Sequence, residues 1–225
     1  MNFYRVMIDI GKKKKFACGC LTKNYNSKLT VCSGCGIEWN MPGGDIWFND
    51  KTWEMEIYLD REYYADFINS QIREIISKKA KNVFINNFNN AVDFGEIKMI
   101  SCNELTEQQI KKIKDYYGYA AIKNIPNNPP QYYRLLLKQG ADLDFIKSNV
   151  RLVLDCPECG RKDYSRSYDH IGDPLKIFII ESTWKGYDIF HVEGMGNTVF
   201  CTEQFIDVYN QNELKGLEFN KIITV

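Results

Sequence analysis

Two five-residue motifs contain the side chains best suited to bind a metal ion. They are Cys32-Ser33-Gly34-Cys35-Gly36 and Cys156-Pro157-Glu158-Cys159-Gly160. In each motif, which we call a knuckle, a tight turn can direct both thiolates at one point, and the last glycine can adopt the positive φ that such a turn often requires. One knuckle supplies half of a tetrahedral zinc site and two supply all of it. The sequence therefore predicts a Zn²⁺ ion bound by Cys32, Cys35, Cys156 and Cys159.

The two knuckles lie far apart in the sequence. The 120 residues from 36 to 155 separate them, whereas a compact zinc ribbon has about 15–20 residues between its cysteine pairs. A site built from both knuckles would join the two ends of the chain and leave a large insertion between them. Cys18 and Cys20 keep an alternative open, because they could form a local four-cysteine site with the first knuckle. That alternative has a poorer one-residue spacing and leaves the second knuckle without a role, so we prefer the long-range site.

Other candidate chemical groups are few. Four thiolates fill the coordination shell of zinc and leave no position for water or substrate, so we predict a structural metal and no enzymatic activity. His170 follows the second knuckle and His191 falls in an expected strand, and a structural role is the preferred interpretation of both. Cys201 precedes an expected helix whose dipole could lower the pKa of the thiol. We identify no positioned base that would make it a nucleophile.

Composition places the chain among globular proteins with a substantial core. It has 225 residues, 44% of them apolar and 26% charged, and its net charge is zero. The charge is uneven: residues 1–40 hold seven basic and two acidic side chains, whereas residues 181–225 hold seven acidic side chains and three lysines. No apolar run approaches the ~18 residues of a membrane span, and the first residues lack the apolar run of a secretory signal. We therefore expect a cytoplasmic protein with no membrane partner.

Hydrophobic patterns predict an α+β protein. Strands are expected at residues 3–10, 53–59, 94–101, 151–154, 175–180, 187–192, 198–201 and 217–225, and helices at about 60–79, 106–117 and 202–214. The first helix is inferred from a stripe of apolar residues between 64 and 76 at spacings of three and four, with Asp60 as its N-cap. Thr106 and Gln109 fit a capping box at the start of the second, and Thr202 caps the third.

From these elements we predict a mostly antiparallel sheet that joins the N- and C-terminal parts around the knuckle pair. Residues 1–49 would hold the opening strand and the first knuckle. Residues 50–130 would form an inserted α/β lobe that ends in a proline-rich linker. Residues 131–225 would hold the second knuckle and the C-terminal sheet and helix, and would form one domain with residues 1–49.

The order of the motifs along the whole chain resembles the double Cys-x-x-Cys-Gly family. Its members are immunity proteins of bacterial polymorphic toxin systems, including the swarming-inhibition type. The shared features are an aromatic opening strand, Cys32 to Trp39, Cys156 to Gly160, Trp184 to Phe190, Thr202 to Phe205 and Gly216 to Phe219. This chain differs in its abundance of Lys, Asn and Ile and in the additional Cys18-Gly19-Cys20. The resemblance implies a cytoplasmic protein that binds and neutralises one cognate toxin and has no catalytic activity.

A protein toxin domain is thus the expected partner. If that toxin is a basic nuclease, the acidic C-terminal part could contact it through Asp188, Glu203 and Asp207. Two other classes remain open. A zinc-ribbon protein that binds nucleic acid would use the basic N-terminal region and its aromatic residues, with an affinity that falls steeply with salt. An enzyme would use Cys201 or His170. The leading interpretation involves neither nucleic acid nor catalysis.

Overall fold

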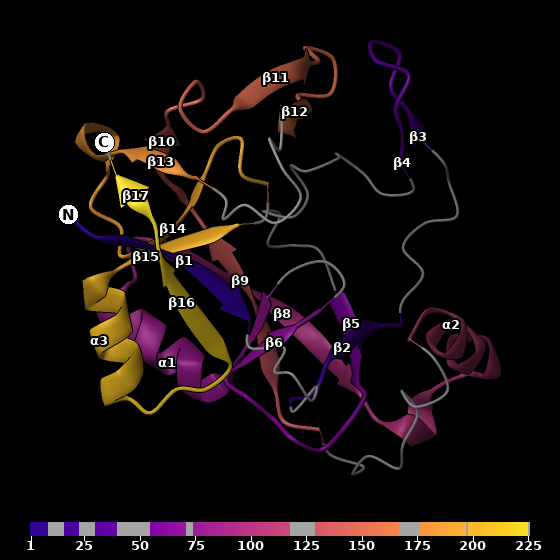
Figure 1. Ribbon diagram of the computed structural model, residues 1–225. Helices are drawn as coiled ribbons and strands as arrows, with labels where there is room; N and C mark the ends of the chain where they lie inside the picture. The colour runs from indigo at the N-terminus through magenta and orange to yellow at the C-terminus, as the bar shows by residue number, and fades with distance from the viewer. Residues whose placement is uncertain are drawn as a thin grey trace.

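Two β-sheets contain most of the strands in the computed structural model (Figure 1). The structure describes residues 1–8, 16–22, 30–39, 55–70, 74–117, 129–166, 176–196 and 198–224. Within these ranges lie three α-helices: α1 (Lys78–Asn87), α2 (Glu107–Tyr117) and α3 (Glu203–Gln211). The predicted α+β class is confirmed. The predicted proline-rich linker at 125–130 lies outside the described residues except for 129 and 130, and His170 lies outside them as well.

The seven-stranded sheet places the first strand of the chain among the last ones. Its spatial order is β16 (Leu217–Lys221), β1 (Phe3–Ile8), β15 (Val199–Thr202), β14 (Ile189–Val192), β10 (Gln139–Leu143), β13 (Phe178–Ile180) and β17 (Ile223–Thr224). Strand β1 pairs antiparallel with β15 on one side, where Phe3 faces Thr202, and with β16 on the other, where Ile8 faces Leu217. The β10–β14 and β13–β17 pairs are parallel. The backbone of the N-terminal segment is therefore hydrogen-bonded into the C-terminal part.

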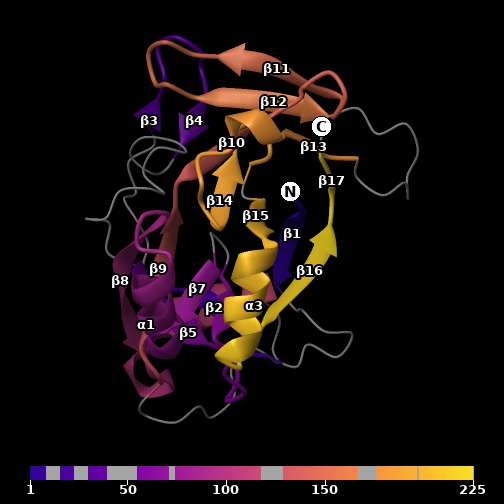
Figure 2. The same cartoon turned by 90° about the vertical axis from the view of Figure 1, so that its left-hand side faces the viewer.

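Five of the six strands in the six-stranded sheet come from the segment between the two knuckles, and the sixth, β2, precedes the first knuckle. Its order is β2 (Gly19–Leu21), β5 (Met55–Leu59), β8 (Val92–Ile100), β9 (Tyr132–Leu137), β7 (Glu74–Ser77) and β6 (Phe67–Asn69). Two further pairs of strands form separate ribbons: β3 (Thr30–Val31) with β4 (Glu38–Trp39), and β11 (Val150–Asp155) with β12 (Lys162–Arg166). Figure 2 shows both ribbons at the same end of the molecule, with β11–β12 crossing above the seven-stranded sheet.

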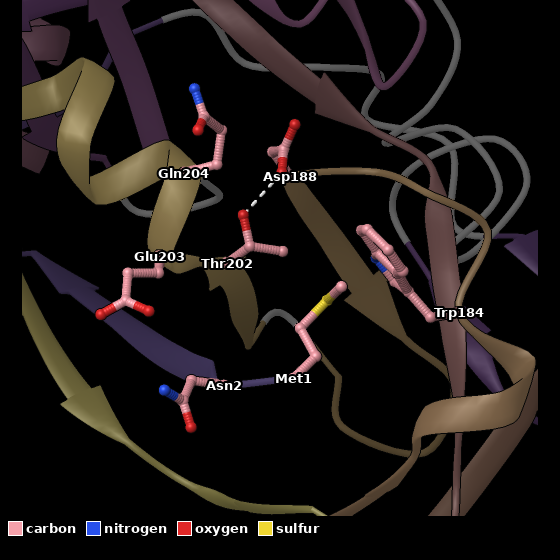
Figure 3. A pocket seen from close by; sticks show the side chains of 7 residues that line it. All are labelled: Met1, Asn2, Trp184, Asp188, Thr202, Glu203 and Gln204. Atoms are coloured by element: carbon pink, nitrogen blue, oxygen red, sulfur yellow. Dashed lines mark hydrogen bonds between the residues drawn. The ribbon is translucent and has the colours of Figure 1, made fainter.

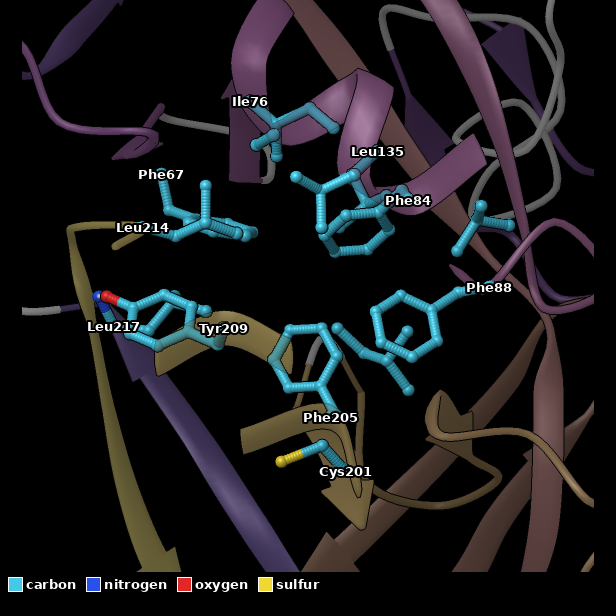
Figure 4. Close-up of a cluster of buried hydrophobic side chains, with 14 of the residues drawn as sticks. Phe67, Ile76, Phe84, Phe88, Leu135, Cys201, Phe205, Tyr209, Leu214 and Leu217 are labelled. Carbon is cyan, nitrogen blue, oxygen red and sulfur yellow. Dashed lines mark hydrogen bonds between the residues drawn. The ribbon is translucent and has the colours of Figure 1, made fainter. Parts of the chain in front are cut away.

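The largest hydrophobic cluster lies between α1, α3 and strands of both sheets (Figure 4). Phe205 of α3 is at its centre, with ring centroids 5.6 Å from Phe84 of α1 and 5.2 Å from Phe88. Phe67 contributes from the six-stranded sheet and packs 5.9 Å from Tyr209. Because both sheets contribute side chains to this one cluster, burial of its apolar surface stabilises their association.

The predicted helix at 60–79 is wrong. Phe67 and Ile68 lie in β6, Ile75 and Ile76 lie in β7, and the helix α1 begins only at Lys78, with the Ser77 hydroxyl accepting from the N–H of Ala80. Both faces of the six-stranded sheet are covered here: Phe67 and Ile76 pack in one hydrophobic cluster, and Ile68 and Ile75 in another. A strand buried on both faces shows consecutive apolar residues instead of alternation, and this short pattern resembled a helical stripe.

The other two predicted helices are present with the expected caps. The Thr106 hydroxyl accepts from the N–H of Gln109 at 3.2 Å, and the Gln109 side chain accepts from the N–H of Thr106 at 2.9 Å, which is the reciprocal pair of a capping box. At α3, the Thr202 hydroxyl accepts from the N–H of Phe205 at 3.4 Å. Local sequence signals therefore located both helix starts.

A close backbone approach joins the segment after α3 to β6, and it provides the first test of the fold. Gly216 has φ +111°, and an added Cβ would overlap the backbone oxygen of Phe67. Gly216→Ala should therefore lower the free energy of unfolding by about 3 kcal/mol, from backbone strain plus displacement of β6. Gly186→Ala is the matched control, because Gly186 has φ +80° but no atom within 4 Å of an added Cβ, and it should cost about 1 kcal/mol. Equal losses in urea denaturation would contradict the close approach.

Candidate metal centre

The first knuckle is a tight turn between β3 and β4. The backbone N–H of Cys32 donates to Ile37 at 3.0 Å, and the N–H of Gly36 donates back to the carbonyl of Cys32 at 2.9 Å. Gly36 has φ +67°, a conformation that other L-residues adopt rarely. These bonds hold Cys32 and Cys35 on one side of the turn. Trp39 follows the first knuckle and is predicted to pack over it, but its side chain is outside what the structure describes.

The second knuckle has the same local structure between β11 and β12. Here the N–H of Cys156 donates to Arg161 at 2.9 Å, and the N–H of Gly160 donates to Cys156 at 2.8 Å. Gly160 has φ +68°, close to the φ +67° of its counterpart in the first knuckle. The repeated Cys-x-x-Cys-Gly pattern thus encodes one turn twice.

The four knuckle sulfurs meet at one point. Their Sγ atoms all lie within 4.8 Å of one another, with 3.6 Å between Cys32 and Cys156 and 3.8 Å between Cys35 and Cys159. A tetrahedral zinc ion with Zn–S bonds of about 2.3 Å requires sulfurs about 3.8 Å apart. The spacing and the all-thiolate donor set therefore fit a four-coordinate zinc ion, and the predicted long-range meeting of the knuckles is present in the structure.

Gly34 permits the two knuckles to come this close. A Cβ at this position would lie 2.5 Å from Cγ of Glu158 and 3.2 Å from Sγ of Cys156. The sequence pattern assigned a role to the glycine that ends each knuckle but not to this one. The two knuckles differ between their cysteines, with Ser-Gly in the first and Pro-Glu in the second, and this difference was the only sequence signal that could have indicated a role for Gly34.

The pKa values of the knuckle thiols depend on hydrogen bonds from the knuckle backbone, on burial and on the neighbouring sulfurs. The backbone N–H of Cys35, followed by that of Gly34, helps to lower the pKa of Cys32 to about 7, although burial opposes this. For Cys159 the backbone N–H of Arg161 also favours the thiolate, but burial and the three neighbouring sulfurs outweigh it and raise the pKa to about 12. Four negative sulfurs at this spacing repel one another, and a divalent cation between them removes that repulsion.

A second set of contacts fixes the β11–β12 ribbon to the seven-stranded sheet. The Tyr164 hydroxyl donates to Glu193 at 2.5 Å, and the ammonium of Lys162 bonds to the same carboxylate oxygen at 2.9 Å. These two donors, Tyr164 first, lower the pKa of Glu193. Phe145 stacks on the Tyr164 ring with centroids 5.7 Å apart. Because Glu193 directly follows β14, these bonds set the position of the second knuckle relative to the sheet.

The local alternative with Cys18 and Cys20 is not what the structure shows. Among the described residues, the only group of three or more potential ligand residues close enough to hold a metal consists of the four knuckle cysteines. Cys20 is fully buried in a hydrophobic cluster on β2, and Cys18 lies near Asp60, whose carboxylate accepts from its N–H at 2.7 Å. Neither thiol reaches the knuckles.

The structure also places Cys201, His191 and Cys102, whereas His170 lies outside the described residues. Cys201 is completely buried in β15, and desolvation, with a smaller effect from Asp188, raises the pKa of its thiol, so the expectation of a lowered pKa at the helix start is wrong. His191 lies in β14, where its Nδ1 is 3.1 Å from the carbonyl oxygen of Thr198. Cys102 is partly exposed in a short 3₁₀ turn.

The three predicted partner-contact residues lie at or near the start of α3. Asp188 immediately precedes β14, Glu203 is the first residue of α3, and Asp207 is one turn further along that helix. Burial, followed by Glu203, Cys201 and Asp207, raises the pKa of Tyr4 on the adjacent β1. Three carboxylates therefore lie at or near the start of α3.

No family model matches the chain, and a search of curated proteins finds no match. Among the described residues, no helix is both long and apolar enough to cross a membrane.

Proposed function

We propose that this protein acts by binding, as an immunity protein that neutralises a cognate polymorphic toxin, and that a structural zinc ion holds its two knuckles together. The observation that carries the proposal is the cluster of four cysteine sulfurs within 4.8 Å. Four thiolates give zinc a closed coordination shell, which suits a structural role and offers no position for a substrate.

The toxin as partner rests on the resemblance of the motif order to the double Cys-x-x-Cys-Gly family. The three carboxylates at or near the start of α3 give a further reason to expect a basic partner, because complementary charge accelerates association and favours the correct orientation. Asp188, Glu203 and Asp207 have no ion-pair partner among the described residues, so their charges are available to a partner.

Co-expression with the toxin encoded beside this gene tests the function. The protein should restore bacterial growth, and the triple variant Asp188→Lys, Glu203→Lys, Asp207→Lys should bind the toxin at least about tenfold more weakly, because charge reversal replaces attraction with repulsion. Growth assays and calorimetry with catalytically inactive toxin give the two readouts. The matched control reverses three exposed carboxylates elsewhere, Glu62, Glu107 and Asp115. Failure of the wild-type protein to protect against that toxin would overturn the proposed function.

A further inference from the structure

A cavity of about 510 Å³ opens beside the start of α3 (Figure 3). This volume lies within the ~300–1,000 Å³ typical of ligand pockets. Its lining comes from the start of the chain, from the segment before β14 and from the end of β15: Met1, Asn2, Trp184, Asp188, Thr202, Glu203 and Gln204. Two of the three predicted partner-contact residues are therefore walls of one cavity.

Trp184 provides a fixed aromatic wall. Its indole Nε1–H donates to the carbonyl of Tyr187 at 2.9 Å, so the ring is held in place and its only donor is occupied. Phe3 supports it from the sheet, with ring centroids 6.1 Å apart. Figure 3 shows the Met1 side chain and the indole ring on the same side of Thr202, with Asp188 above them and Glu203 on the opposite side. A flat aromatic face of this kind attracts a cation or a planar group.

The polar walls of the cavity are negative. The Thr202 hydroxyl donates to Oδ1 of Asp188 at 2.6 Å, which orients the carboxylate, and Oδ2 has no hydrogen-bond partner among the described residues. Neither Asp188 nor Glu203 forms an ion pair within the described chain. The nearby Met1 ammonium is instead bonded to Glu181 at 2.7 Å.

The dipole of α3 does not make the charge around the cavity positive. A helix N-terminus carries roughly half a positive charge. Here the Thr202 side chain already accepts from the N–H of Phe205, and Glu203 in the first turn offsets the dipole. Asp188 and Glu203 line the cavity together with Met1, whose ammonium is already paired with Glu181, so the balance of charge favours a cationic ligand over an anionic one.

We infer that this cavity receives the side chain of an arginine presented by the partner protein. A guanidinium is planar, so it can stack on the Trp184 ring while its N–H groups bond to the Asp188 carboxylate, with Glu203 supplying the second negative charge. A lysine ammonium matches the charge but not the flat indole or the fork-like hydrogen bonding. This inference rests on the proposed function in one respect, that the arginine belongs to a bound protein.

A titration with three short peptides tests the site on the intact protein. The probes are acetyl-Gly-Gly-Xaa-Gly-Gly-amide with arginine, lysine or citrulline, a neutral analogue of arginine with nearly the same shape, at the central position. The Trp184 indole N–H, assigned by its loss in Trp184→Phe, is followed by NMR. We expect a saturable shift with the arginine peptide at low millimolar concentration, and affinities at least about fivefold lower for lysine and tenfold lower for citrulline.

Two conservative variants, Asp188→Asn and Glu203→Gln, should each lower the affinity for the arginine peptide by about five- to tenfold. Glu218→Gln on β16 is the matched control and should leave the affinity unchanged. The amide oxygen introduced by Asp188→Asn can still accept from Thr202, and Glu203→Gln keeps the helix cap, so at least one variant should fold. Equal binding of citrulline and arginine, no effect of either variant, or no saturable shift up to about 10 mM would overturn the site. Equal binding of lysine would overturn the assignment to arginine.

The same variants separate this inference from the proposed function. If wild-type protein protects cells from the toxin while Asp188→Asn and Glu203→Gln bind that toxin as tightly as wild type, the proposed role of the cavity in toxin binding is wrong and the proposed function stands. If the peptide titration succeeds but wild type gives no protection, the arginine site stands and the toxin is not its source.

Discussion

Cys156→Ser should abolish zinc binding and lower the free energy of unfolding by about 4 kcal/mol when free zinc is held near one thousand times the dissociation constant of the wild-type site. The Cys156 sulfur is buried and lies 3.6 Å from that of Cys32. Serine cannot replace a thiolate ligand, so the folded state loses the stabilisation that metal binding gives it. For a chain of this length the loss corresponds to a melting temperature roughly 10 °C lower.

Zinc stoichiometry and thermal unfolding, measured on the same preparations, check this result. The wild type should carry one zinc ion per chain and the variant none, and a chelator should bring the wild type close to the variant. Cys102→Ser is the matched control, since Cys102 is a partly exposed thiol outside the cluster and should change stability by less than about 1 kcal/mol. A Cys156→Ser protein that keeps its zinc, or unfolds as the wild type does, would contradict a metal site at the knuckles.

The sulfur cluster was the part of the structure that sequence alone predicted best. A knuckle is a local motif whose turn, glycine and hydrogen bonds lie within a few residues, so Cys32–Gly36 and Cys156–Gly160 each define their own geometry. Cys156 and Cys159 were preferred over Cys18 and Cys20 as partners of the first knuckle because they have the same two-residue gap between cysteines, whereas Cys18 and Cys20 have a one-residue gap. Helix caps at Thr106 and Thr202 were found for the same reason: the signal is local.

Features that depend on tertiary contacts were missed. The residues of β6 and β7 look helical because both faces of their sheet are covered, and nothing in positions 64–79 reveals what packs on them. The position of Cys201 before a helix suggested only that a dipole could lower the pKa of its thiol, whereas its complete burial raises that pKa. The cavity beside Trp184 is built from three segments of the chain, so only the folded chain brings Met1 and the start of α3 to Trp184 and Asp188.

Phe205 fixes α3 to the α1 region through the hydrophobic core, and its ring contacts involve none of the strands that carry the knuckles. It belongs to α3, which starts directly after β15, and its ring packs against Phe84 and Phe88 from the α1 region. The aromatic cluster thus holds α3, and with it the wall of the cavity that contains Glu203, in place. We therefore expect zinc loss and core damage to have separable effects, the first on the knuckles and the second on α3.

Phe205→Ala should lower the free energy of unfolding by about 3–5 kcal/mol, because it removes a fully buried ring and leaves a cavity among aromatic side chains that cannot all collapse into it. Urea denaturation followed by circular dichroism measures the loss, and zinc stoichiometry of the folded fraction should remain that of the wild type. Ile85→Ala, on the exposed side of α1, is the control and should cost less than about 1 kcal/mol. If the two variants were equally stable, Phe205 would not be at the centre of the core. If Phe205→Ala lost its zinc while still folded, the core and the metal centre would not be the separate supports inferred from their positions.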